Sequence, residues 1–115
     1  SEEHDADIPL NVARIYDRQG KLPDARHWYR QAIYIDPFAL APHEGLAAAC
    51  MKAGDTSAAI AEYRALCALQ PENAQRFADA AFAYHKQGDT ENARKYAAQA
   101  VRLDPNSPAK PLLGS

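Results

Sequence analysis

Apolar residues recur along this chain at the three- and four-residue spacing that marks one face of a helix. Val12, Ile15 and Tyr16 form such a stripe, and it stops at Gly20. A glycine just past a helix end can adopt the left-handed conformation needed there, and a proline cannot continue a helix. Stripes closed by Gly or Pro follow one another along the chain. The pattern predicts six helices, at residues 7–19, 23–35, 41–53, 56–69, 74–87 and 90–103.

Three glycines and three prolines that close these stripes share a spacing of 34 residues: Gly20, Gly54 and Gly88, and Pro37, Pro71 and Pro105. Each unit is therefore expected to be a helix, a tight turn, a second helix and a proline-marked turn. One helical hairpin of this size cannot bury its apolar face, but stacked copies can, and stacking produces a solenoid. The spacing predicts three repeats, at residues 6–39, 40–73 and 74–107, after an N-terminal extension at residues 1–5.

Small and aromatic residues keep the same period. Ala13, Ala47 and Ala81 stand at one position of the three repeats, where a small side chain lets paired helices touch. In the second helix of the first repeat, Ala25 is followed four residues later by Tyr29. These residues and their period resemble the tetratricopeptide repeat family. The resemblance implies an all-α fold, a right-handed solenoid of three helix-turn-helix hairpins that serves as a scaffold for protein–protein interaction.

The third repeat departs from the family pattern in its second helix. The second repeat keeps the aromatic residue, because Tyr63 follows Ala59 by four positions. In the third repeat, Ala93 is followed four positions later by Ala97, and the aromatic residue, Tyr96, is displaced by one position. We therefore expect this helix to pack differently from its counterparts.

Composition and charge exclude several classes of partner. Of the 115 residues, 47% are hydrophobic and only five are glycine, as a helical protein requires. Charged residues amount to 24% and nearly cancel, leaving a net charge of −2. Binding to nucleic acid needs clustered Lys and Arg, so none is expected. No apolar run approaches the roughly 18–20 residues that cross a bilayer, so membrane insertion is not expected either.

The two ends of the chain raise separate expectations. The chain starts with Ser and ends in Gly-Ser, which indicates a fragment of a larger protein. Its compartment is therefore unknown, with the cytoplasm favoured, because targeting signals can lie outside a fragment. Residues 108–115 are expected to be a disordered or tag-derived tail, with no room for another helix. The last repeat would then lack a polar cap, which predicts possible self-association through uncapped ends. The alternatives are that the parent protein continues or that the Leu112-Leu113 tail folds back into a neighbour.

No catalytic, metal or cofactor site is expected, and the chain is predicted not to be an enzyme. The four histidines are scattered, with no pair at the i, i+4 spacing of a zinc-binding helix. There is no G-x-S-x-G turn and no glycine-rich phosphate loop. Carboxylates on predicted surface helices are ordinarily solvated. Cys50 and Cys67 are predicted to be reduced and buried, because their helix positions are too far apart for a disulfide.

The resemblance also implies a location for partner binding. Tetratricopeptide repeat proteins usually bind peptides on a concave face, which the first helix of each repeat lines. Mapping the repeat onto this chain gives the expected partner-binding residues Leu10, Arg14, Arg18, Glu44, Met51, Lys52, Gln75, Asp79, Phe82, His85 and Lys86.

Two features of this set have alternative interpretations. Arg18, Lys52 and Lys86 are 34 residues apart and would form a basic ladder for an acidic extended segment. The alternative is that each cation only stabilises the C-terminal end of its helix. Leu10, Met51 and Phe82 would supply apolar pockets, or would instead pack between neighbouring repeats.

One specific kind of binding is not expected. Chaperone-binding members of the family hold a C-terminal carboxylate with a clamp of Lys, Asn and Arg. The corresponding positions here are Leu10, Arg14, Gly45, Gln75 and Asp79, and only one of them is basic. We therefore expect no carboxylate clamp. The predicted function is non-enzymatic binding of a protein or peptide, possibly acidic; the alternative is a structural spacer or oligomerisation element of a larger protein.

Overall fold

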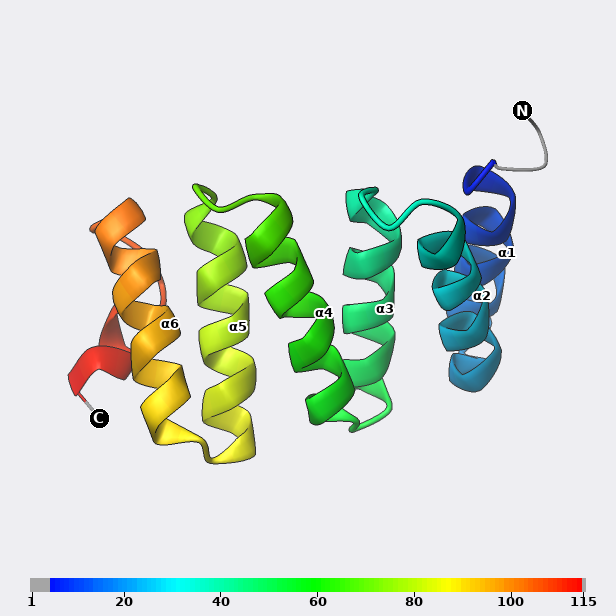
Figure 1. Ribbon diagram of the computed structural model, residues 1–115. Coiled ribbons are helices and arrows are strands. Elements are labelled where there is room, and N and C mark those ends of the chain that lie inside the picture. The colour runs from blue at the N-terminus through cyan, green and yellow to red at the C-terminus, as the bar shows by residue number, and fades with distance from the viewer. Residues whose placement is uncertain (1–4, 115) are drawn as a thin grey trace. The chain divides into compact units, whose positions relative to one another are not determined.

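The computed structural model describes residues 5–114, which form six α-helices and one short 3-10 helix (Figure 1). The elements are α1 (Asp7–Arg18), α2 (Leu22–Ile35), α3 (Leu40–Lys52), α4 (Thr56–Leu69), α5 (Ala74–Gln87), α6 (Thr90–Leu103) and η2 (Lys110–Gly114). The predicted bounds of the last three α-helices match, and those of the first three differ by one residue at one or both ends. Residues 5–114 contain no strand, so the predicted all-α class is confirmed.

The glycines that close the stripes have the conformation that their spacing predicts. Gly20, Gly54 and Gly88 have φ angles of 73°, 78° and 84°, in the left-handed region. A side chain at these positions would strain the backbone, because only glycine adopts this region without a steric cost. The same turn chemistry therefore recurs between the two helices of every predicted repeat.

The chain divides into two compact units, and the division does not follow the predicted repeats. The N-terminal unit ends at Asp55 and contains α1, α2 and α3, whereas the C-terminal unit begins at Thr56 and contains α4, α5, α6 and η2. In the first, α2 packs against both α1 and α3; in the second, α5 packs against both α4 and α6. Helices α2 and α5 thus pack on a helix of the neighbouring predicted repeat as well as on the other helix of their own, as stacking requires.

Close contacts between small residues hold the N-terminal unit together. Ala13, Ala25 and Ala32 are fully buried. Tyr29 of α2 lies directly against Gly45 of α3, and a β-carbon at position 45 would overlap the tyrosine ring. Position 45 therefore has to be glycine for α2 and α3 to approach this closely.

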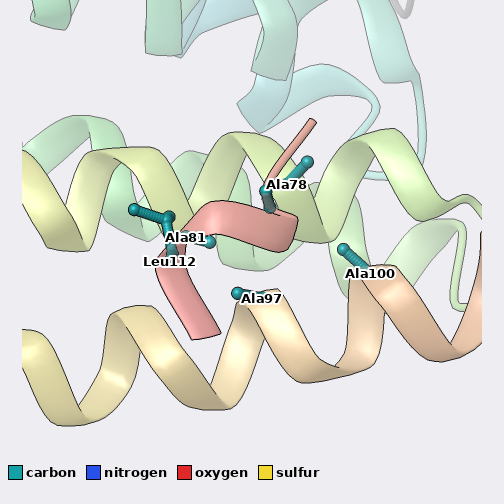
Figure 2. Close-up of a cluster of buried hydrophobic side chains, with 6 residues drawn as sticks. Ala78, Ala81, Ala97, Ala100 and Leu112 are labelled. Carbon is teal, nitrogen blue, oxygen red and sulfur yellow. The ribbon is translucent and has the colours of Figure 1, made fainter. Parts of the chain in front are cut away.

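The C-terminal tail is ordered, which corrects the prediction of a disordered tail over residues 108–115 within the described part of the chain. Residues Lys110–Gly114 form η2, and Leu112 is only 7% exposed. Leu112 and Ala109 pack with four buried alanines of α5 and α6, namely Ala78, Ala81, Ala97 and Ala100 (Figure 2). The small side chains leave room that one leucine fills. Sequence periodicity misses this contact because it involves a single apolar anchor rather than a stripe.

The tail also changes the expectation of uncapped ends. Leu112 covers the alanine face of α5 and α6, so the C-terminal end of the array is not left open as predicted. On α1, in contrast, Ile8 and Ile15 are 58% and 46% exposed. Self-association therefore stays a prediction, with the exposed face of α1 as one candidate surface. Within residues 5–114, no helix is both long and apolar enough to span a bilayer.

Candidate functional site

The expected partner-binding residues are divided between the two units. Leu10, Arg14, Arg18, Glu44, Met51 and Lys52 belong to the N-terminal unit, and Gln75, Asp79, Phe82, His85 and Lys86 belong to the C-terminal unit. Each group is therefore described within its own unit.

Leu10 does not lie on an open surface. It is only 7% exposed and forms part of the core, which contradicts its predicted role as an apolar pocket. The alternative interpretation, helix-to-helix packing, is the one the structure supports for this residue. Met51 is half-buried, and Glu44 is exposed on α3.

The N-terminal unit contains a charged hollow built around Asp17. The hollow has a volume of about 260 Å³ and is lined by Arg14, Asp17, Arg18, Tyr29 and Lys52. Lys52 Nζ donates a hydrogen bond to Asp17 Oδ1 at 2.9 Å, and the hydroxyl of Tyr29 donates to Asp17 Oδ2 at 2.8 Å. Both carboxylate oxygens are thus occupied. The structure brings three expected residues, Arg14, Arg18 and Lys52, together at one place.

The contacts of Asp17 set the charges in this hollow. Burial opposes ionisation of Asp17, but hydrogen bonds from Lys52 and Tyr29 and the positive charge of Lys52 outweigh it, so its pKa lies below the ordinary value. Burial, followed by the hydrogen bond to Asp17, raises the pKa of Tyr29 to about 12. At neutral pH Asp17 is therefore ionised and Tyr29 is a neutral donor. Three cations surround one carboxylate, and the hollow has a net positive charge.

The cations of this hollow differ in their contacts with Asp17. Lys52 is paired with Asp17, although its side chain is 58% exposed. Arg14 and Arg18 are exposed at the rim. Arg18 and Lys52 also stand in the last turns of α1 and α3, so stabilisation of helix ends operates alongside any role in binding.

Tyr29 is a site residue that the sequence does not reveal. Its position in the repeat predicts packing, and its ring does pack against Gly45. Its hydroxyl, however, reaches Asp17, which is twelve residues away along the chain. A tyrosine that is buried along its ring and polar at its tip commonly finds such a partner. The hydroxyl group of Tyr29 is the only feature of the sequence that could indicate this contact.

In the C-terminal unit, four of the five expected residues lie on one face of α5. Gln75, Asp79, Phe82 and Lys86 follow the spacing of a single helix face. The side-chain amide of Gln75 donates a hydrogen bond to Asp79 Oδ1 at 2.8 Å. Phe82 is 42% exposed, and His85 and Lys86 are exposed near the end of the helix. This stripe offers an apolar side chain flanked by groups of both charges.

Metal ligands and cysteines are the remaining groups of the described residues that could carry other chemistry. Within residues 5–114, no three His, Cys, Asp or Glu side chains are placed to hold a metal ion. Cys50 and Cys67 are buried and are not joined in a disulfide, as predicted.

Comparisons with known proteins identify the repeats. The "TPR repeat" model matches residues 47–88, and two tetratricopeptide repeat models match residues 74–107 and 10–35. The range 74–107 coincides with the third predicted repeat. No curated protein sequence matches the chain.

Several solved structures share the fold at low sequence identity. The first TPR domain of Spaghetti (RPAP3) bound to the HSP90 peptide SRMEEVD is 20% identical, with a TM-score of 0.76 over 95% of this chain and 88% of that one. The Yersinia enterocolitica type III secretion chaperone SycD, in complex with a peptide of the translocator YopD, is also 20% identical, with a TM-score of 0.74 over 94% and 82%.

A tetratricopeptide repeat protein from Parabacteroides merdae is 21% identical, with a TM-score of 0.79 over 90% of this chain and 41% of that one. The matched models together cover most of the six helices, and these structures share their arrangement. The chain belongs to the tetratricopeptide repeat family.

Proposed function

We propose that this chain is a non-catalytic module that binds a peptide or helix of a partner protein, and that the charged hollow of the N-terminal unit receives an acidic group of that ligand. The tetratricopeptide repeat fold is typical of protein–protein interaction. The observation that carries the finer proposal is the set of three cations, Arg14, Arg18 and Lys52, around the single carboxylate of Asp17. An acidic side chain would meet exposed guanidinium groups, which bind carboxylates with two parallel hydrogen bonds.

The network around Asp17 prepares the hollow for such a ligand. Asp17 is held by Tyr29 and Lys52, so its carboxylate is already neutralised in part and is fixed in place. The two exposed arginines are therefore left with surplus positive charge. A hollow that is ordered before binding loses less conformational freedom when the ligand arrives.

Two of the structurally similar proteins support a peptide ligand. The RPAP3 domain holds the HSP90 peptide SRMEEVD, and SycD holds a peptide of YopD. We do not carry the carboxylate clamp over to this chain. Arg14 is the single cation among the five clamp positions, and the ring of Tyr29 lies against Gly45 at one of them. The acidic group of the ligand is instead expected at Arg14 and Arg18, in the C-terminal half of α1.

The test starts from peptides selected by phage display on the purified chain. Selected peptides should be enriched in Asp and Glu, and Arg14→Gln with Arg18→Gln should weaken their binding by about tenfold or more, since a charged partner would lose two hydrogen-bonded cations. Arg30→Gln with Arg94→Gln is the matched control, because both arginines are exposed and line neither this hollow nor its rim. Equal weakening by both pairs, or selection of neutral peptides, would refute the proposal.

The alternative function, an oligomerisation element or spacer, has one observation in its favour. Ile8 and Ile15 are exposed two turns apart on the same face of α1. If this face pairs with a second copy, sedimentation should show dimers that Ile8→Gln with Ile15→Gln converts to monomers. A clean monomer at high concentration would exclude the oligomerisation element and leave the spacer as the alternative.

A further inference from the structure

The C-terminal unit has two hollows that share the rings of Phe77 and Tyr96. One has a volume of about 580 Å³, with alanines of α4 on its other side. The second, of about 390 Å³, continues along α6 past Tyr96. Together they form a groove between α4 and α6 with α5 beneath, which we name the α4–α6 groove.

The displaced aromatic residue of the third repeat explains why this groove is open. The position that holds Tyr29 and Tyr63 in the first two repeats holds Ala97, which is fully buried beside the C-terminal tail. Tyr96 instead stacks on Phe77, with ring centroids 6.2 Å apart, and leans on Tyr84 at 5.2 Å. Its ring is half-buried: one side lines the surface groove, and the ring also packs against the buried clusters of the C-terminal unit.

The wall of the groove on α4 is made of small side chains. Ala61, Ala65 and Ala68 line it and follow the i, i+4, i+7 spacing of one helix face. Ala61 and Ala68 are exposed, and alanine is too short to cover Phe77. A helix lying along this wall could approach closely, because no long side chain stands in its way.

The charged residues that line the groove are all positive. Arg64, Lys95 and Arg102 line its two parts, and none of the described residues that line it is acidic. Arg64 is exposed and lies near the hydroxyls of Tyr96 and Tyr84, whose negative potential raises its pKa. The groove thus combines an apolar centre with a cationic rim, the anatomy of a protein interface.

This groove is separate from the surface of the proposed function. Phe77 and Phe82 are five residues apart on α5, which is a rotation of about 140° around the helix axis. The stripe of Gln75, Asp79, Phe82 and Lys86 therefore faces a different direction from the groove.

We propose that the α4–α6 groove is a second docking surface, and that its occupant is an amphipathic helix of another protein with an apolar stripe flanked by carboxylates. The apolar stripe would lie on Phe77, Tyr96 and the alanine wall. The carboxylates would meet Arg64, Lys95 and Arg102. The choice of occupant follows from charge complementarity, since no acidic residue of the groove opposes an acidic ligand and three cations attract it.

The probe is a fluorescein-labelled helical peptide with leucines on one face and glutamates on both sides of them. We expect it to bind, and amide resonances of Ala61, Ala65, Ala98 and Gln99 to shift in heteronuclear NMR spectra. Ala61→Glu with Ala98→Glu should weaken binding by about tenfold or more, because both exposed positions would then oppose the peptide's charge. Gln31→Glu with Ala48→Glu, at exposed positions of the N-terminal unit, is the control of equal charge.

Matched peptides and the free protein supply the outcomes that would overturn the proposal. A peptide with lysines in place of glutamates should not bind, and a version broken by a central proline should bind at least about tenfold less. If the lysine peptide binds equally well, the predicted charge complementarity is refuted. If the proline-containing peptide binds equally well, the predicted helical form of the ligand is refuted. The proposal is also refuted if the peptide does not bind, or if the shifts are confined to the face of Phe82. Shifts of groove resonances when the protein is diluted without peptide would indicate a second copy as the occupant, which refutes it as well.

Discussion

The hollow of the N-terminal unit and the groove of the C-terminal unit are both built from helices of the same repeat motif, but their linings differ in chemistry. In the first, the hydroxyl of Tyr29 joins Lys52 in holding Asp17, and charged groups form the lining. In the second, alanines and two aromatic rings form the centre, and cations stand only at the rim. One of the differences between them is the position of an aromatic residue, Tyr29 in the first and Tyr96 in the second.

That difference shows how little change a repeat needs to acquire a new surface. Tyr29 packs inward against Gly45 and directs its hydroxyl to a charged partner. In the third repeat Ala97 takes the interior position, and the aromatic residue one place earlier points about 100° away around the helix. Tyr96 then stacks on Phe77, and both rings are half-buried. The helix and its 34-residue period are kept, while the aromatic ring points in a different direction.

The largest expected effect is on stability, through the C-terminal tail that packs on the buried Ala97. Leu112→Ala should lower the free energy of unfolding of the C-terminal unit by about 2–3 kcal/mol, because it removes a buried leucine from the alanine cluster. Urea denaturation would measure the change. Leu113→Ala is the control: Leu113 is 40% exposed, and its loss should cost about 0.5 kcal/mol or less. Equal effects of the two substitutions would mean that Leu112 does not anchor the tail.

A smaller effect is expected from closing the space that Tyr29 occupies. Gly45→Ala should destabilise the N-terminal unit by about 1–2 kcal/mol, because overlap with the tyrosine ring outweighs the better helix propensity of alanine. Thermal denaturation measures the cost. In Tyr29→Leu the obstruction is gone, so adding Gly45→Ala to that variant should be neutral or stabilising. A fully additive double-mutant cycle would show that the two residues do not contact each other.

The charged hollow should make stability depend on acid pH. The pKa of Asp17 is lowered in the folded protein, so its contribution is complete above the ordinary carboxyl pKa near 4 and is lost as pH falls through the lower folded value. Asp17→Asn should reduce this decline and cost about 1 kcal/mol at pH 7, through the loss of charge-assisted hydrogen bonds. Urea unfolding between pH 7 and about pH 2 is the measurement.

The control for this pH dependence is Asp24→Asn, at an exposed position of α2 outside the hollow. It should keep the decline of the unaltered protein. Some decline remains in Asp17→Asn as well, because hydrogen bonds from Asn92 lower the pKa of Asp89 in the same way. If Asp17→Asn and the unaltered protein lose stability in parallel, Asp17 is not held as the structure shows.

The smallest effect is on chemistry rather than stability. Burial, and then the negative charge of Asp79, raise the pKa of Cys67 to about 11. At pH 8 we expect alkylation by iodoacetamide to be about a hundredfold slower than for a free cysteine, since the thiolate is the reactive form. Mass spectrometry would follow the reaction, with the urea-unfolded chain as the control. Cys67 is among the residues that line the α4–α6 groove, so rapid labelling of the folded protein would show that the groove is more open than described.

The amount that could be predicted differs sharply between fold and site. The bounds of α4, α5 and α6 follow from local spacing and turn residues, which act over a few positions of the chain. The site residues were harder to predict: Arg14, Arg18 and Lys52 line one hollow, but Leu10 is buried. Repeat position indicates which face a residue occupies, and it does not decide whether a neighbouring side chain covers it.

By itself, the sequence determined the six helices, the left-handed glycine turns and the period of 34 residues, because helix formation and turn chemistry depend on nearby residues. Only the tertiary structure decided that Lys52 and Tyr29 both bind Asp17, that Leu112 closes the alanine cluster, and that Tyr96 lines an open groove. Lys52 and Asp17 are 35 residues apart. Contacts over such separations depend on how close two helices pack, and side chains along their whole lengths set that distance together.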